Sequence, residues 1–178
     1  MNRVSALFLT AKHWQIFVVL FVVPYAAIAA TVVFPSAVYV SIATMLLYAL
    51  FTSGWYWSLG RFVASVVDPA LRLNPIFFHL AIVYPLFYVP VFVWDWFRQN
   101  SLSAGVIIPL HLLAMFCILY VFTFVAKNLA MVETGKPASL SDYAIPFVLL
   151  WFFPIGVWMI QPKVNRLYSE TEAARTRF

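Results

Sequence analysis

Long apolar stretches separated by short polar breaks dominate the chain. An α-helix needs about 20 mostly apolar residues to cross a bilayer, and five stretches come near that length. They cover residues 14–34, 37–60, 75–97, 105–126 and 143–160. The pattern predicts an all-α polytopic membrane protein with five transmembrane helices. Residues 1–162 would form a single transmembrane helical bundle, and residues 163–178 a polar C-terminal tail.

The breaks between the stretches carry signals for helix ends. Only residues 34–36 separate the first two stretches, which predicts a tight antiparallel hairpin. Asn74 and Pro75 open the third stretch with a capping residue and a proline in the first turn, where a proline costs least. Ser141 and Asp142 open the fifth, where a carboxylate suits the positive end of the helix dipole. No loop is long enough to fold as a soluble domain.

The first stretch has a second interpretation as a signal peptide. Its apolar residues 16–23 are followed by Pro24 and by Ala27-Ile28-Ala29, which is similar to a cleavage site. Residues 30–34 continue the apolar run to full spanning length, and this favours a retained helix. Cleavage would leave four transmembrane helices.

Composition agrees with a lipid environment. Hydrophobic residues make up 65% of the chain and charged residues 10%, whereas soluble domains carry about 25% charged residues. The net charge of +5 comes from single basic residues beside apolar stretches, which is typical of membrane-interface anchors and not of a nucleic-acid surface. Cys117 is the one cysteine, so no intramolecular disulfide can form.

Five crossings would divide the basic residues between two faces. The N-terminal face would hold Arg3, Lys12, Arg61, Arg72, Lys127 and Lys136. The opposite face would hold Arg98, Lys163, Arg166, Arg175 and Arg177. Because basic residues near the spans favour the cytoplasm, this count slightly favours a cytoplasmic N-terminus and an external tail.

Two proline-containing segments suggest a duplicated helical hairpin. Residues 154–158 (Pro-Ile-Gly-Val-Trp) echo residues 90–94 (Pro-Val-Phe-Val-Trp). The stretches before them also share a pattern, at residues 47–52 and 119–123. Parallel repeats of this kind occur in some transporters, although a chain with 7 Trp and 11 Pro also produces such echoes by chance.

The residue types needed for chemistry are absent from the apolar stretches. None of the five contains an interior Asp, Glu, Lys or Arg, which argues against a proton- or sodium-coupled transporter. His79 and His111 would lie in opposite leaflets and could not share a haem iron, and His13 lies at an interface. No nucleophile–base pair, carboxylate pair or phosphate-binding loop is present. We therefore expect no enzyme activity, no cofactor and no metal.

Small residues and prolines predict helix contacts. Gly54 and Ser58 lie four residues apart on one helix face and would let another helix approach closely. The residues expected to mediate helix packing or an interface are Gly54, Ser58, Pro90, Pro154 and Gly156. The aromatic residues 55–57 also fit a belt at the membrane surface. Pro154 leaves the carbonyl of Leu150 without its helical donor, and a neighbouring helix is expected to supply one.

The C-terminal quarter, from about Phe124 to Tyr168, resembles a loose group of small polytopic bacterial inner-membrane proteins without an assigned activity. The shared features are a lysine–glutamate loop, an Asp-Tyr entry and a Trp-Phe-x-Pro-Ile-Gly-x-Trp-x-Ile-Gln-Pro span. The matching residues here are Lys127, Glu133, Asp142, Tyr143, Trp151, Phe152, Pro154, Ile155, Gly156, Trp158, Ile160, Gln161 and Pro162. The resemblance implies a small multi-pass bacterial inner-membrane protein and transfers no functional residue.

Taken together, these patterns favour a non-enzymatic membrane component that acts through helix–helix association. Its partners would be membrane lipid and either further copies of itself, as a homo-oligomer, or another membrane protein, as in complex subunits, immunity proteins or phage-defence components. The alternative is an oligomeric pore or uncoupled transporter lined by the proline-kinked helices, with Thr52, Ser53 and Thr123 facing the path. A cavity lined by those residues, with Pro90 and Pro154 across it, would favour this alternative.

Overall fold

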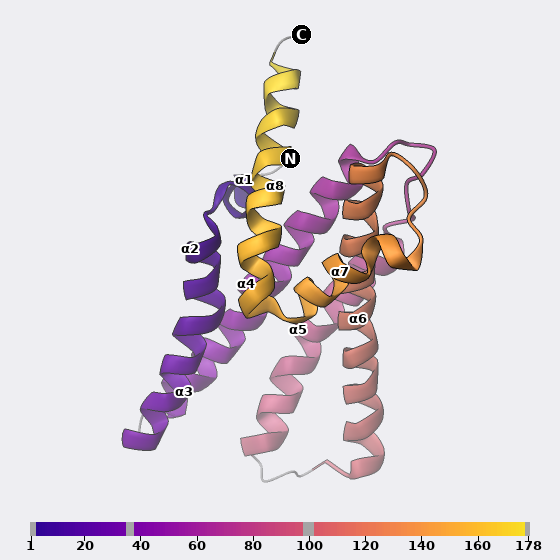
Figure 1. Ribbon diagram of the computed structural model, residues 1–178. Helices are drawn as coiled ribbons and strands as arrows, with labels where there is room; N and C mark the ends of the chain where they lie inside the picture. Colours follow the sequence, from indigo (N-terminus) through magenta and orange to yellow (C-terminus); the bar gives the residue numbers. More distant parts are fainter. Residues whose placement is uncertain (1–2, 35–37, 98–101, 177–178) are drawn as a thin grey trace.

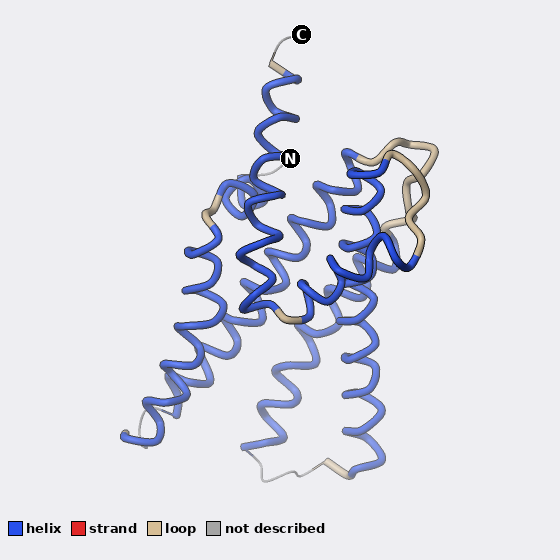
Figure 2. Tube along the Cα trace, in the orientation of Figure 1, coloured by secondary structure: helices blue, strands red, loops and turns tan. Residues whose placement is uncertain are grey.

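The computed structural model describes residues 3–34, 38–97 and 102–176, and over these ranges the chain forms helices and loops without a strand (Figure 2). The helices are α1 (Arg3–Thr10), α2 (His13–Phe17), the π-helix η1 (Val18–Val22), α3 (Val23–Val33), α4 (Val38–Val66), α5 (Ile76–Phe97), α6 (Ala104–Thr134), α7 (Leu140–Trp151) and α8 (Phe153–Arg175). The prediction of an all-α protein is confirmed.

Three helical stretches are long and apolar enough to cross a membrane, namely His13–Ala30, Ile76–Trp96 and Ala104–Thr134. They indicate a multi-pass membrane protein. Helix α4 has 29 residues and, at about 1.5 Å per residue, is also long enough. It is not among the three stretches identified as candidate spans, so a count of five spans is not confirmed.

The fifth apolar stretch does not cross the bundle. The chain leaves helical geometry at Phe152, with φ −85° and ψ 59°, and reverses there. Helix α7 runs from the end of α6 into the middle of the bundle, and α8 returns to the same end (Figure 1). Because α7 has 12 residues, its length of about 18 Å is short of a hydrocarbon core of about 30 Å. The prediction of a span over residues 143–160 is therefore wrong, and we refer to residues 140–161 as the re-entrant hairpin.

An ion pair supports this reversal independently. The Lys163 Nζ lies 2.6 Å from the Glu133 Oε1, and a crossing at residues 143–160 would put these two groups on opposite sides of the membrane. The helix also continues through Pro162 to Arg175, beyond the predicted end of the helical bundle at residue 162. Residues 163–175, expected as a polar tail, are thus helical, and Val164 among them is fully buried.

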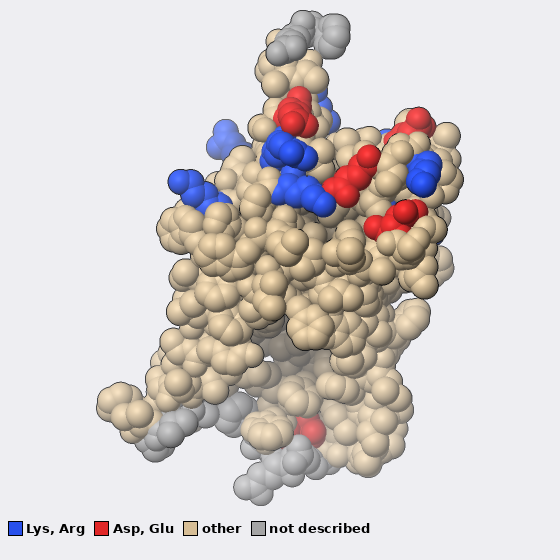
Figure 3. Space-filling model, viewed as in Figure 1, with Lys and Arg blue, Asp and Glu red and all other residues tan. Residues whose placement is uncertain are grey.

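The described lysines and arginines gather at one end of the bundle, which we call the charged face (Figure 3). They belong to α1, the start of α2, the ends of α4 and α6, the loops after α4 and α6, and α8. The predicted division of charge is corrected here, because Lys163, Arg166 and Arg175 share this face with Lys12 and Lys127. Arg98 and Arg177 lie outside the described residues.

The buried core also lies near the charged face. Helix α4 is exposed or half-buried over its described side chains up to Gly54, and most of its residues from Trp55 onward are buried. Fully buried partners come from α6 and α8, with Leu129 and Ile160 among them. In the other half, the α3–α4 and α5–α6 pairs separate and expose apolar side chains such as Ile28 and Leu112.

The expected helix starts are close to those observed. The Ile76 backbone N–H donates to the Asn74 Oδ1 at 2.9 Å, which confirms the cap of α5. Helix α7 is capped by Ser139, two residues before the expected Ser141, and the Ser139 N–H donates to the Asp142 Oδ2 at 2.8 Å. The hydrogen bonds from Ser139 lower the pKa of the Asp142 carboxyl.

The predicted duplicated hairpin is not present. Pro90 lies inside the continuous helix α5, which leads away from the charged face, whereas Pro154 lies in the first turn of α8, which leads towards it. The two proline motifs therefore sit in different structural settings with opposite directions. Their similarity in sequence reflects composition and not a repeated unit.

Candidate functional site: a cavity beneath the re-entrant hairpin

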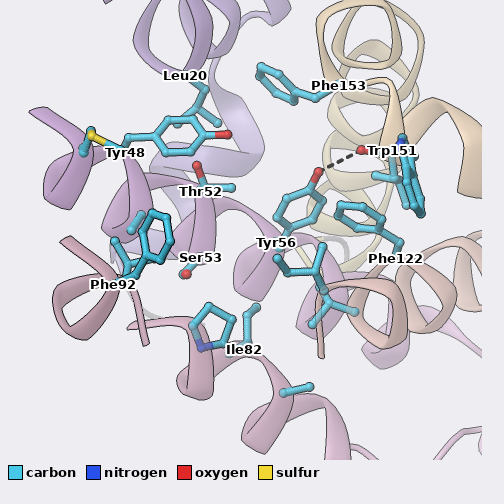
Figure 4. A pocket seen from close by; sticks show the side chains of 18 of the residues that line it. Leu20, Tyr48, Thr52, Ser53, Tyr56, Ile82, Phe92, Phe122, Trp151 and Phe153 are labelled. Carbon is cyan, nitrogen blue, oxygen red and sulfur yellow. Dashed lines mark hydrogen bonds between the residues drawn. The ribbon is translucent and has the colours of Figure 1, made fainter. Parts of the chain in front are cut away.

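A cavity of about 340 Å³ lies between α4, α5 and α6, beneath the tip of the re-entrant hairpin. Its walls are apolar and aromatic, with Leu20, Ile82, Phe92 and Phe122 on the sides and Trp151 and Phe153 at the tip (Figure 4). The front of the molecule is hollowed below this tip, in the half away from the charged face (Figure 3). Among the described residues, the lining includes no Asp, Glu, Lys, Arg or His.

Four hydroxyl-bearing residues of α4 face this apolar space: Tyr48, Thr52, Ser53 and Tyr56. Residues four apart on a helix share a face, so α4 presents a polar stripe along one wall. The buried Thr52 Oγ1 has no partner with hydrogen-bond geometry among the described residues. The Tyr48 hydroxyl lies beside it (Figure 4). Because buried polar groups are nearly always hydrogen-bonded, this stripe suits a ligand with one polar group.

The tip of the hairpin is held to α4 by one hydrogen bond. Proline lacks an N–H, so Pro154 leaves the carbonyl of Leu150 without a helical donor. The buried Tyr56 hydroxyl donates to that carbonyl at 3.0 Å. The expectation that a neighbouring helix satisfies this carbonyl is confirmed, although at a chain reversal and not at a kink.

A buried amide on α8 lies beyond the hairpin tip, towards the charged face. The Trp55 Nε1–H donates to the Gln161 Oε1 at 2.8 Å. The Gln161 Nε2 in turn donates to the carbonyls of Phe8 at 2.8 Å and Ala11 at 3.1 Å. Gln161 is 0% exposed and joins α1, α4 and α8. In the sequence, Gln161 was noted only as part of the C-terminal motif. The one signal for its role in joining the three helices was the position of an amide at the end of an apolar stretch.

The small residues expected at helix contacts meet other parts of the same chain. A Cβ on Gly156 would lie 1.6 Å from the Leu149 carbonyl oxygen, so only glycine allows α8 to pass so close to α7. A Cβ on Gly54 would lie 3.0 Å from the Phe8 ring. The buried Ser58 hydroxyl donates to the Gly54 carbonyl at 2.7 Å.

The structure brings together only some of the residues expected to line a path. Thr52 and Ser53 line the cavity, and so does Pro85, which the sequence did not single out. Pro90 is exposed and Pro154 half-buried, and neither is in the lining. The Thr123 hydroxyl donates to the Leu119 carbonyl at 2.8 Å and is also outside the lining.

The histidines lie apart and have structural contacts. The His13 ring lies tilted against Trp158, at 4.5 Å between centroids, and the His79 ring lies 4.6 Å from that of Trp57. The His111 Nδ1 lies 2.7 Å from the Tyr88 hydroxyl. Within the described ranges, no three His, Cys, Asp or Glu side chains converge as metal ligands would.

The hydroxyl stripe could have been found in the sequence. Tyr48, Thr52 and Tyr56 recur at a spacing of four, and Ser53 is next to one of them. The aromatic residues at the hairpin tip could not have been assigned to the cavity from the sequence, because their position depends on the reversal at Phe152.

Comparisons with protein-family models, curated proteins and solved structures found no match to this chain.

Proposed function

We propose that the protein is a membrane-embedded binding protein that takes a mainly apolar molecule with one polar group into the cavity beneath the re-entrant hairpin. The observation that carries this proposal is the hydroxyl stripe of α4 facing an otherwise apolar space of about 340 Å³. That volume and composition are typical of small-molecule pockets, which combine apolar walls with a few placed polar groups.

The chemistry of the walls supports a narrow class of ligand. With no Asp, Glu, Lys, Arg or His among the described lining residues, a charged group would lose its hydration without compensation. A hydroxyl or carbonyl group, in contrast, can bond to Thr52 and Tyr48. An alkyl or isoprenoid chain that ends in such a group matches both features.

The two sides of the cavity differ, and this difference indicates how a ligand would enter. On the charged face, the bonds Trp55–Gln161 and Tyr56–Leu150 lie between the cavity and water. On the other side, the molecule is hollowed at the depth of the apolar helices (Figure 3). This arrangement supports entry from the lipid phase.

Cavity-filling substitutions test this function. The wild-type protein, purified in mild detergent, would be analysed by native mass spectrometry and lipid extraction for bound apolar molecules. Ala49 lines the cavity, whereas Ala43 lies exposed on the same helix outside it. Ala49→Phe should lose the bound molecule and Ala43→Phe should keep it. Thr52→Val, which keeps the shape and removes the hydroxyl, should weaken binding. Equal retention by Ala49→Phe and Ala43→Phe would refute the proposal.

Association through apolar helix faces is a second proposal, supported by the exposed side chains of α3, α4 and α5. Ile28, Leu47 and Phe87 are among them. It places the protein in a bacterial inner membrane as a homo-oligomer or as a subunit beside another membrane protein. Light scattering in mild detergent and identification of co-purifying chains test it, and a monomer without partners would contradict it.

The pore alternative requires movement of the hairpin, because Trp151 and Phe153 at its tip line the end of the cavity. Its support is the presence of Thr52 and Ser53 in the lining. Solute flux into liposomes that contain the protein tests this alternative.

A further inference from the structure

A second pocket, of about 400 Å³, lies near the charged face between α1, α4 and α8. Its polar lining residues are two arginines and three serines: Arg61, Arg175, Ser5, Ser58 and Ser65. Helix α4 contributes three of them at spacings of three and four, so they share one helix face. Ser5 and Ser58 are buried, which places hydroxyl groups at the bottom of the pocket and guanidinium groups at its rim.

Arg61 is the cation of this pocket that no carboxylate neutralises. Its guanidinium carbon lies 5.8 Å from the centroid of the Trp57 ring, a cation–π distance that holds the side chain in place. The ion pairs among the described residues involve Lys163, Arg166 and Arg175 but not Arg61. Its donors are therefore available to a ligand.

Arg175 keeps donors for a ligand although it has a partner. Its Nη1 donates to the Glu172 Oε1 at 2.9 Å, which leaves the Nη2 and Nε hydrogens. The Ser58 and Ser65 hydroxyls donate to helix carbonyls, those of Gly54 and Phe62, each at 2.7 Å. A hydroxyl hydrogen rotates about its C–O bond, so each can turn towards an anion.

The end of α4 does not cancel this positive charge. A helix C-terminus carries partial negative charge on its free carbonyls. Here the Arg72 Nη2 lies 3.4 Å from the carbonyl oxygens of Ser65 and Val67. Arg72 thus compensates the carbonyls, and Arg61 is left to act in the pocket.

We infer that this pocket binds a phosphate-bearing group. Guanidinium groups match phosphate oxygens with paired donors, and hydroxyl groups at the bottom of the pocket can bond to the remaining oxygens. The group could belong to the headgroup of an anionic lipid or to a soluble phosphate, and the chemistry of recognition is the same. The site is separate from the cavity beneath the hairpin and does not depend on its occupant.

The test compares two arginines of the charged face. Full-length protein in detergent would be titrated with phosphatidic acid, with phosphatidylcholine and with inorganic phosphate, and bound species counted by native mass spectrometry. Arg61→Ala should lower the affinity for the phosphate-bearing species about tenfold or more. Arg166→Ala removes the same charge from an exposed arginine outside the pocket and should leave the affinity within about twofold.

Further variants separate binding from folding. Arg61→Lys keeps the charge but loses the paired donors, so its affinity should fall between those of wild type and Arg61→Ala. Glu172→Gln frees a donor of Arg175 and should raise the affinity. Binding of phosphatidic acid alone would assign the site to a lipid headgroup, and binding of inorganic phosphate would assign it to a soluble anion. Equal losses in Arg61→Ala and Arg166→Ala would overturn the inference, as would no selectivity for phosphatidic acid or inorganic phosphate over phosphatidylcholine.

Discussion

The hydroxyl of Tyr56 donates a 3.0 Å hydrogen bond to the carbonyl oxygen of Leu150, 94 residues further along the chain. This bond joins α4 to the point where the re-entrant hairpin turns back. It satisfies the carbonyl that Pro154 deprives of a helical donor, and it forms part of the roof of the cavity.

Tyr56→Phe should therefore loosen the hairpin tip. Loss of the hydroxyl leaves the Leu150 carbonyl buried without a donor, which costs about 1–3 kcal/mol. Hydrogen exchange of residues 148–156 should accelerate. Tyr84→Phe is the matched control, because it also removes a 3.0 Å bond to a carbonyl, that of Leu110, but between α5 and α6. If both variants change exchange at the tip equally, the bond has no specific role there.

Gln161→Leu should loosen α1 against the bundle. The change leaves the Trp55 indole N–H and the Phe8 carbonyl without the partners they have here, at about 1–3 kcal/mol for each group that stays buried. The Ala11 carbonyl keeps a hydrogen bond from the Asn165 Nδ2 at 3.2 Å. The expected result is a lower thermal midpoint and faster proteolysis after Lys12. Gln15→Leu is the control, since the Gln15 Oε1 accepts one exposed bond from the Lys12 N–H. An unchanged cleavage rate in Gln161→Leu would contradict this role.

Gly156→Ala should displace the hairpin, because the added Cβ would meet the Leu149 carbonyl oxygen at 1.6 Å. Neither backbone can yield without separating α7 from α8, so we expect a large loss of thermal stability and of ligand retention. Gly105→Ala adds the same methyl group at an open position, 3.8 Å from the Ser103 hydroxyl. That variant should behave as wild type, and similar stability of the two variants would exclude a tight contact at Gly156.

Residues 136 and 174, before and after the re-entrant hairpin, should label from the same side of the membrane. In a Cys117→Ala background, Lys136→Cys and Ala174→Cys should react with a membrane-impermeant maleimide that is added on one side of the membrane. Ser103→Cys should react with the maleimide that is added on the opposite side. Since basic residues gather on the charged face (Figure 3), we expect that face in the cytoplasm. Labelling of Ala174→Cys from the same side as Ser103→Cys would support a fifth crossing over residues 143–160 and would contradict the reversal.

The sequence predicted the features that depend on nearby residues. Apolar length and composition identified helices, Asn74 marked a start, and Pro154 marked the free carbonyl of Leu150. The prediction of the fifth span was wrong for a physical reason. The hydropathy of a segment indicates whether its surroundings are apolar, but it does not indicate whether the chain continues in one direction or turns back. The reversal at Phe152 depends on partners 94 and 106 residues away, Tyr56 for Leu150 and Trp55 for Gln161.

The uneven position of the core has a mechanical consequence. Near the charged face, buried side chains and the bonds of Gln161 fix the helices to one another. In the other half, the α3–α4 and α5–α6 pairs diverge (Figure 1) and carry exposed apolar side chains such as Ile28 and Leu112. In a bilayer, we expect the surrounding acyl chains to influence the distance between the two pairs, so that lateral tension or a thinner bilayer would change the width of the cavity mouth.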